Sequence, residues 1–297
     1  MSGRKDFVVI VNSMLKHRCR SIQCSRVPSF PGSDFAAGCV SPALPSGASS
    51  RVARYGFSLV ELLVVIVVIG ILTALLVPSF AAASHRSSVA LDLSNLRALQ
   101  MAHYQYAIDN KGRFADAGLS HGGLENQEIA WLNLIGEHID IKAHVRSPLD
   151  KSPHWTVPIE GTSDRYRRTS YGWNNYLSRT HSPAAAIDPL DTVDSLARAK
   201  NPSNTIHFLH MAGTGAYAGA DHVHVENWWI SDAHPDAAAV LASNQVETNI
   251  VSGQRGTSTA QANYGFVDGH VKTLTFGEAY ASPSWNRFDP EVAGRSF

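Results

Sequence analysis

The order of hydrophobic and polar positions divides the chain into three stretches. Residues 1–56 are basic, rich in Ser, Pro and Gly, and without clear periodicity, and Ser41–Ser50 is typical of loop or disordered chain. From Leu62 to Ser84 no side chain carries a charge, and most of Leu62–Val77 is Leu, Val and Ile. As a helix, Phe57–Val77 would be about 31 Å long, enough to cross the hydrocarbon core of a bilayer. The pattern therefore predicts a membrane-spanning helix over residues 57–77.

Two other interpretations of this apolar run fit less well. A core helix of a soluble protein is rarely apolar on every side over such a length. A secretory signal has an apolar region of about 7–15 residues, followed by small residues at its cleavage site. Here the run is longer, and its distinctive residues precede it. We therefore expect the segment to act as a lasting membrane anchor.

Beyond Pro78 the pattern becomes amphipathic. Apolar side chains recur at steps of about three and four, at Val89, Leu93, Leu96, Leu99 and Tyr106, with Arg86, Asp92, Asn95 and Arg97 between them. This spacing predicts an amphipathic helix over residues 78–110 that ends at Lys111-Gly112. We expect Pro78 to kink the long helix or to mark its exit from the membrane.

Residues 111–297 combine short apolar clusters with turn residues. A shorter helix is predicted over Glu125–Ile139 and another over Asp236–Ser243. Strand candidates are Ser170–Leu177, Thr205–Leu209, His222–Ile230 and Asn263–Phe276. The predicted fold class is α+β, with one long N-terminal helix packed on an antiparallel β-sheet head with long loops.

Charge is distributed unevenly along the chain although its formal net charge is zero. Residues 1–56 carry eight Lys or Arg and two acids, while the remainder carries 17 basic and 23 acidic residues. A basic leader before an apolar segment predicts a cytoplasmic N-terminus and an exported head. The head has no large basic patch, so we expect no nucleic-acid partner. All three cysteines, Cys19, Cys24 and Cys39, precede Gly56, so a chain cut there has no disulfide.

The segment Gly56-Phe57-Ser58-Leu59-Val60-Glu61 and the apolar run after it resemble the processing site of type IV prepilins and type II secretion pseudopilins. The match combines a Gly, an aromatic residue, a Glu at the fifth mature position and Pro78 at the twenty-second. The resemblance implies a pilin-like fold, cleavage by a prepilin peptidase between Gly56 and Phe57, and N-methylation of Phe57. Val52 is a candidate alternative start, which would leave a leader of five residues.

Glu61 is the one acid at the start of the predicted span. An ionisable residue in a membrane segment is a candidate functional residue. The resemblance implies that Glu61 meets the amine of Phe57 on a neighbouring subunit during filament assembly, and places Pro78 in the same assembling helix. The alternative is that Glu61 lies in the water-exposed interface at little cost.

A second resemblance concerns the head. Asn95–Leu99, Tyr106–Phe114, Ser170–Asn174 and Asn201–Thr205 are similar to recurrent pieces of pseudopilin-like proteins. One subgroup of these proteins has a C-terminal His-x9-Asp-Gly segment, and Phe266–Val271 is similar to its end. Ser258 occupies the His position, so the role of that His does not carry over.

Asp268, Gly269 and His270 have two interpretations. Asp268-Gly269 between two β-rich runs is a hairpin signal, and a type I′ turn needs positive φ at both positions. Tyr264, Phe266 and Val271 would then pack across the strands. The alternative is a ligand role for Asp268 and His270.

His222, His224 and Glu226 are the candidate metal ligands. On a strand all three would point to one face, and two His with a carboxylate could hold Zn²⁺. The alternative is an ordinary polar face that alternates with Val223 and Val225. No loop is rich enough in acids to predict Ca²⁺, and no other cofactor is predicted.

These observations favour a structural, non-enzymatic subunit of a pilus or pseudopilus in a type II secretion or type IV pilus system. Its expected location is the inner membrane, as a single-pass protein with a periplasmic head that could reach the cell surface in a filament. Its expected partners are the prepilin peptidase, other pilin-like subunits and the inner-membrane assembly machinery. The alternative is a membrane-anchored binding module for a ligand such as a polysaccharide, with Trp131, Trp173, Trp228 and Trp229 as the binding surface. A metal-dependent hydrolase is a third hypothesis.

Overall fold

The computed structural model describes residues 56–119, 127–229, 234 and 236–295. The predicted leader up to residue 55, with its three cysteines, lies outside these residues, as do Glu125 and Ile230 at the ends of two predicted elements. The residues from Ser58 onward belong to one compact unit.

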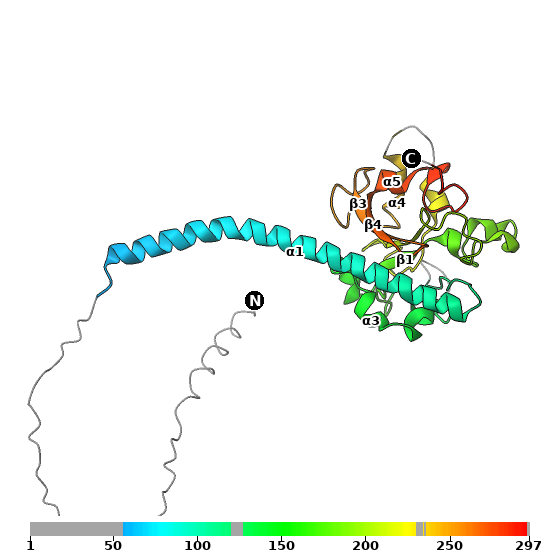
Figure 1. Ribbon diagram of the computed structural model, residues 1–297, viewed down its shortest axis with the longest axis horizontal. Coiled ribbons are helices and arrows are strands. Elements are labelled where there is room, and N and C mark those ends of the chain that lie inside the picture. The colour runs from blue at the N-terminus through cyan, green and yellow to red at the C-terminus, as the bar shows by residue number, and fades with distance from the viewer. Residues whose placement is uncertain (1–55, 120–126, 230–233, 235, 296–297) are drawn as a thin grey trace, which may run out of the picture. The chain divides into compact units, whose positions relative to one another are not determined.

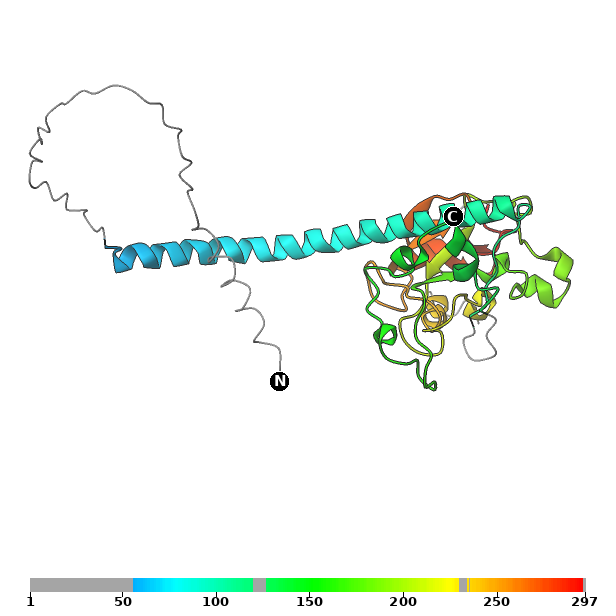
Figure 2. The same ribbon diagram turned by 90° about the horizontal axis from the view of Figure 1, so that it is seen from below.

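The first element of this unit is α1, a single helix over Leu59–Asp109. It includes both the apolar and the amphipathic segments predicted from the sequence. Pro78 lies inside α1 and does not end it, and Figures 1 and 2 show a smoothly curved helix. A proline lacks the N–H that would bond the carbonyl four residues earlier, so one bond of the helix is missing there. The remaining bonds carry the helix past it.

The C-terminal end of α1 follows the prediction. Lys111 and Gly112 adopt positive φ values of 60° and 80°. The Gly112 N–H donates to the carbonyl of Ala107 at 2.7 Å. This left-handed turn satisfies a helix-end carbonyl and reverses the chain.

A four-stranded antiparallel sheet forms the centre of the head, in the order β1-β2-β3-β4. Its strands are β1 (Tyr171–Trp173), β2 (Ile206–His210), β3 (Gln261–Phe266) and β4 (Val271–Thr275). A separate pair is formed by β5 (Tyr280–Ser282) and β6 (Trp285–Asn286). The long helix and this sheet confirm the α+β class.

Short helices connect the strands. The α-helical ones are α2 (Trp131–Leu134), α3 (Ile141–His144), α4 (Ala237–Ala242) and α5 (Phe276–Ala279). The 3₁₀ turns are η1 (Ile135–Glu137), η2 (Pro153–Trp155), η3 (Asn175–Leu177), η4 (Pro183–Ala186), η5 (Pro189–Asp191) and η6 (Val225–Trp228). The helix predicted over Glu125–Ile139 thus appears in its described part as the shorter pair α2 and η1. The helix predicted over Asp236–Ser243 is α4.

The strand predicted over His222–Ile230 is wrong. His222 makes an isolated bridge with Trp173, and the chain then turns into η6. Both Val225 and Trp228 are buried, and their three-residue separation suits a 3₁₀ turn with its period of three. The burial of Val225 and Trp228 therefore follows the period of a 3₁₀ turn, not the alternation of buried and exposed residues expected for a strand.

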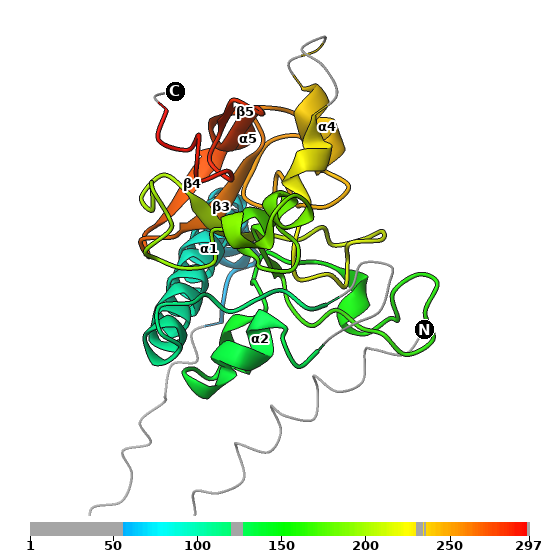
Figure 3. The same cartoon turned by 90° about the vertical axis from the view of Figure 1, so that its right-hand side faces the viewer.

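The sheet separates two apolar clusters. Figure 3 shows α1 and α4 on different sides of the sheet. The cluster on the α1 side contains, among others, Leu96, Leu99, Phe114, Trp131, Trp173 and Phe208. The other contains Tyr264, Phe266, Trp228, Ala239, Phe276 and Phe288, with other residues. Along β3, Tyr264 and Phe266 therefore face away from α1.

Between α1 and the sheet lies a layer of buried polar side chains. The Asp92 carboxylate accepts hydrogen bonds from Tyr171 at 2.7 Å and Asn263 at 2.7 Å and pairs with His210 Nε2 at 2.9 Å. These partners belong to β1, β3 and β2. One helix side chain therefore connects to three neighbouring strands.

Gln100 adds a second link two turns along α1. Its amide donates to the Phe266 carbonyl at 2.7 Å, and its carbonyl oxygen contacts His207 Nδ1 at 2.7 Å. Asp92 and Asn95, which the sequence placed among the polar positions of an amphipathic helix, are both buried. The sheet supplies donors to Asp92, while the Asn95 amide donates to the Arg146 carbonyl and contacts His144 Nδ1, so these buried groups have protein partners.

Candidate functional site

The start of α1 has a complete capping box. The Ser58 hydroxyl accepts a hydrogen bond from the Val60 N–H at 3.3 Å, and Glu61 Oε2 accepts one from the Ser58 N–H at 2.8 Å. Two backbone donors of the helix end are thereby satisfied, and the carboxylate lies at the positive end of the helix dipole. Glu61 is therefore held at the first turn.

Gly56 and Phe57 precede the cap in an exposed, non-helical segment. Phe57 is 83% exposed, and a Cβ built on Gly56 would meet no atom within 4 Å. Because Gly56 has no side chain and its surroundings are open, the backbone there can approach a protease site closely. The geometry suits the predicted processing bond.

The first half of α1 exposes apolar side chains on every side. Among the described residues, α1 is the one helix long and apolar enough to cross a membrane, and its apolar segment has no buried residues. Large side chains from Leu59 to Phe80 are about half exposed or more. A surface of this kind belongs in lipid or against other helices.

Residues 51–77 match the family model described as the prokaryotic N-terminal methylation motif. The chain carries a type IV pilin-like prepilin segment. No curated protein and no solved structure matches the chain. The prepilin segment and the apolar half of α1 indicate a membrane-anchored protein that a peptidase processes and that assembles with other pilin-like subunits.

The cap gives Glu61 of the prepilin segment a local role that sequence reasoning missed. The signal was present, because Ser58-x-x-Glu61 is the capping-box pattern. This role does not use up the carboxylate, which has two oxygens and several lone pairs. Only Oε2 is engaged by the Ser58 N–H.

In the head, the predicted metal residues meet a third histidine. The ring centroids of His222 and His224 are 5.1 Å apart, and His181 lies 3.9 Å from His222 and 6.3 Å from His224. Glu226 lies beside this group of rings, where its Oε1 contacts His224 Nδ1 at 3.1 Å. The sequence missed His181 because it precedes His222 by 41 residues and lies in another loop.

The titration of these histidines is strongly perturbed. Burial, with the neighbouring His222, lowers the pKa of His181 to about 4. Burial, with the neighbouring His224, lowers the pKa of His222 to about 3. Both imidazoles are therefore neutral at physiological pH.

A groove lies between α1 and the head. It has a volume of about 690 Å³ and is lined by His85 and Ser88 of α1 and by Asp150, Glu247 and Arg255 of the head, among others. It contains none of the residues singled out from the sequence.

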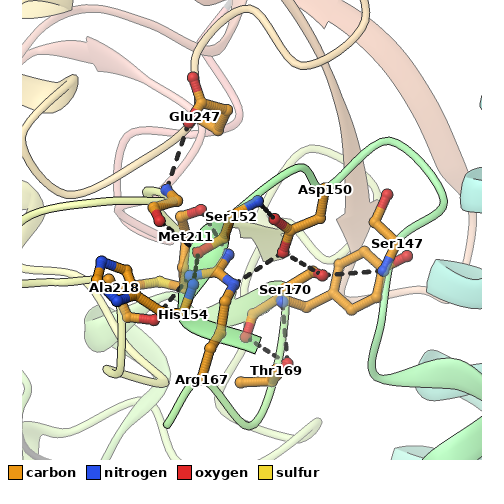
Figure 4. Close-up of polar contacts among 12 residues, drawn as sticks. Ser147, Asp150, Ser152, His154, Arg167, Thr169, Ser170, Met211, Ala218 and Glu247 are labelled. Atoms are coloured by element: carbon orange, nitrogen blue, oxygen red, sulfur yellow. Dashed lines mark hydrogen bonds and ion pairs between the residues drawn. The ribbon is translucent and has the colours of Figure 1, made fainter. Parts of the chain in front are cut away.

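An ion pair is buried beside this groove (Figure 4). The Arg167 guanidinium pairs with Asp150 at 2.8 Å and donates to the carbonyls of Ala212, Ala218 and Met211 at 2.7 to 3.0 Å. Burial raises the pKa of Asp150, but the Arg167 charge and hydrogen bonds outweigh it and lower the pKa overall. All these partners are protein groups, which gives the pair a structural role.

The tryptophans do not form the binding surface of the alternative hypothesis. Trp131, Trp173 and Trp228 are fully buried, and Trp229 is partly buried against the core. Trp131 and Trp173 stack in the interior with centroids 6.4 Å apart. The rings are core residues, so an aromatic groove for sugars is absent from these four positions.

Asp268, Gly269 and His270 lie in the hairpin loop between β3 and β4. Gly269 has a φ of 90°, but Lys111 is the non-glycine residue with positive φ in the described part of the chain. Asp268 therefore does not form the predicted type I′ turn. Its carboxylate accepts a hydrogen bond from the His270 N–H at 3.1 Å and contacts His270 Nδ1 at 2.6 Å, which stabilises the loop.

Ser258 occupies the position of the missing His. Its backbone carbonyl accepts a hydrogen bond from the Gly277 N–H at 2.8 Å.

Proposed function

We propose that the chain is a structural subunit of a pilus or pseudopilus, cut after Gly56 and N-methylated at Phe57. The observation that carries this proposal is the match of residues 51–77 to the methylation motif, which includes the first turns of the exposed apolar helix from Leu59 onward. The apolar half of α1 would anchor the precursor and later form the filament core. The head would form the outer surface.

Orientation follows from charge. The stretch before Phe57 is basic, and positive residues next to a membrane span stay on the cytoplasmic side. We therefore propose an inner-membrane protein with a cytoplasmic N-terminus and a head in the periplasm, in a type II secretion or type IV pilus system. The expected partners are the prepilin peptidase, other pilin-like subunits and the inner-membrane assembly machinery.

Glu61 would act twice in this scheme. Its Oε2 holds the Ser58 N–H of its own helix, and the other oxygen would receive the charged amine of Phe57 from a neighbouring subunit. Such a pair in a low-dielectric setting fixes the axial position of one subunit against the next. A structural role of this kind needs no catalytic residue, so we propose a non-enzymatic subunit.

Processing is tested with Gly56→Val in cells that contain the peptidase. Intact mass spectrometry of the wild-type protein should show a chain that begins at Phe57 with one added methyl group. The variant should keep its leader, since a β-branched side chain obstructs the cleavage site. Gly70→Val is the matched control, because a Cβ on Gly70 would also meet no atom within 4 Å. Normal cutting of the Gly56 variant would refute the proposal.

Assembly is tested with Glu61→Gln and Ser58→Ala. Glutamine can still serve in the capping box but has no charge, whereas Ser58→Ala removes the capping hydroxyl and keeps the charge. If the carboxylate pairs between subunits, Glu61→Gln should be processed but absent from sheared filaments, and Ser58→Ala should assemble. Equal incorporation of both variants would show that Glu61 serves only as a cap.

A further inference from the structure

We propose that His181, His222 and His224 form a binding site for a divalent transition-metal ion, with Zn²⁺ as the best match. The site lies in the head and does not depend on processing or filament assembly. It joins two loops, one between η3 and η4 and one that leads into η6.

One of the three ring pairs, His222 and His224, already has a spacing that suits shared coordination. With Zn–N bonds of about 2.0–2.1 Å, two imidazoles on one tetrahedral zinc have ring centroids about 5 Å apart. His222 and His224 match this value at 5.1 Å, whereas His181 lies closer to His222, at 3.9 Å, and farther from His224, at 6.3 Å. The rings of His222 and His224 are inclined by 70°, and those of His181 and His224 by 72°. The rings of the closest pair, His181 and His222, are inclined by 38°.

Each ring also has its Nδ1 atom next to an oxygen. The partners are the Thr180 hydroxyl for His181 at 2.8 Å, Asp221 for His222 at 3.0 Å and Glu226 for His224 at 3.1 Å. Metal-binding histidines typically present one nitrogen to the ion while the other bonds a carboxylate or another oxygen. We therefore assign Nε2 of each ring to the metal.

A buried amide fixes the two loops against each other. The Asn175 side chain donates to the His181 carbonyl at 3.2 Å and to Glu226 Oε2 at 2.7 Å. Asp221 is held in turn by the N–H groups of Gly118 and Leu119, each at 3.0 Å. The groups that orient the rings are thus themselves anchored, as in many metal sites.

Solvent reaches the site through a pocket of about 340 Å³. His181, His224 and Glu226 line it with Thr180 and Ser182. Three histidine ligands leave the fourth position of a tetrahedral zinc for water or an external ligand. The pocket provides a route for the ion.

Binding must turn at least one ring. In the described part of the chain, no three His, Cys, Asp or Glu side chains are already arranged to hold an ion. The 3.9 Å separation of His181 and His222 is shorter than shared coordination needs, so these rings must part. His181 is partly buried and lines the pocket, whereas His222 is buried, so His181 is the ring of this pair with room to move.

The test uses the full chain in detergent, stripped with a chelator and then titrated with ZnCl₂. We expect one Zn²⁺ per chain with a micromolar or tighter dissociation constant. With CoCl₂ we expect the visible absorption bands of a four-coordinate ion. Failure of the stripped wild-type protein to bind either ion at micromolar concentration would overturn the proposal.

Variants locate the ion. His181 and His224 both line the pocket, and His181→Ala and His224→Ala should each weaken Zn²⁺ binding by at least about tenfold. Glu226→Gln, which changes the partner that orients His224, should have an effect of the same size. His270→Ala is the matched control, because it removes a partly exposed imidazole from the hairpin loop and should leave affinity unchanged. A melting curve of each metal-free variant confirms that it folds. Unchanged affinity in His181→Ala and His224→Ala would also refute the site.

Discussion

Replacing Asp92 with Asn should destabilise the head by an amount that its titration predicts. Burial raises the pKa of the Asp92 carboxyl, but the charge of His210 and hydrogen bonds from the sheet outweigh it and lower the pKa to about 2. Relative to the ordinary value of 3.8, this shift corresponds to about 2 kcal/mol at neutral pH. Asn keeps the shape but places an amide where three partners direct donors, so the loss should reach at least this value.

The effect should have a defined pH range. A carboxyl whose pKa is lower in the folded state stabilises the fold above its unfolded pKa, and this contribution is lost as the pH falls through the folded pKa. For Asp92 the loss occurs between about 4 and about 2. The gap between wild type and Asp92→Asn should therefore stay constant from pH 7 to pH 4.

Urea unfolding of the full chain in detergent measures this gap, with the fluorescence of buried Trp131 and Trp173 as the probe. Asp109→Asn is the matched control on the same helix, since the Asp109 side chain is 51% exposed. It should change stability by less than about 0.5 kcal/mol. If Asp92→Asn unfolds at the wild-type urea concentration, the buried links between α1 and the sheet do not stabilise the head. A gap that closes between pH 7 and pH 5 would assign the effect to a different group.

Three further changes test other parts of the head. Burial lowers the pKa of His103 to about 3, so the unfolded chain takes up its proton first as the pH falls below 6.5, and the fold should lose about 2 kcal/mol from this residue by pH 5. His103→Phe should reduce the loss measured by urea unfolding between pH 7 and pH 5, and an unchanged loss would contradict the burial effect. Arg167→Met leaves Asp150 buried without its partner and should cost about 3–5 kcal/mol in the same assay, whereas a cost below 1 kcal/mol would show that water replaces the guanidinium. Gly269→Ala forces a Cβ onto a residue with a φ of 90°, at 2.9 Å from a Tyr104 ring carbon, and should lower stability by about 1 kcal/mol or more. A melting temperature equal to wild type would show that the hairpin loop can change conformation.

The sequence predicted α1 well because its signals are local. An apolar run, a three-to-four residue period and a Lys-Gly end all lie within the helix itself. All four strands of the central sheet were also recognised from nearby residues, although with different bounds: β1 is shorter than the predicted Ser170–Leu177, whose end forms η3. The His222–Ile230 strand failed because its alternation was equally compatible with a turn that buries Val225 and Trp228.

The partners of polar side chains could not be predicted in the same way. Asp92 looked like a solvent-facing position, and only the arrangement of three strands shows that its neighbours are Tyr171, His210 and Asn263. His181 joins His222 only because the two loops fold together. Such contacts depend on long-range topology, which one sequence does not encode in a readable pattern.

The hydrogen-bonded layer beneath α1 bears on how the subunit would carry mechanical load. An apolar interface allows a helix to slide, because one methyl group can replace another with little penalty. The directional bonds of Asp92 and Gln100 break together when α1 shifts along its axis by a single turn. A pull on the anchor therefore reaches the strands without slippage, so the head should move with its helix as one rigid body in the assembly that we propose.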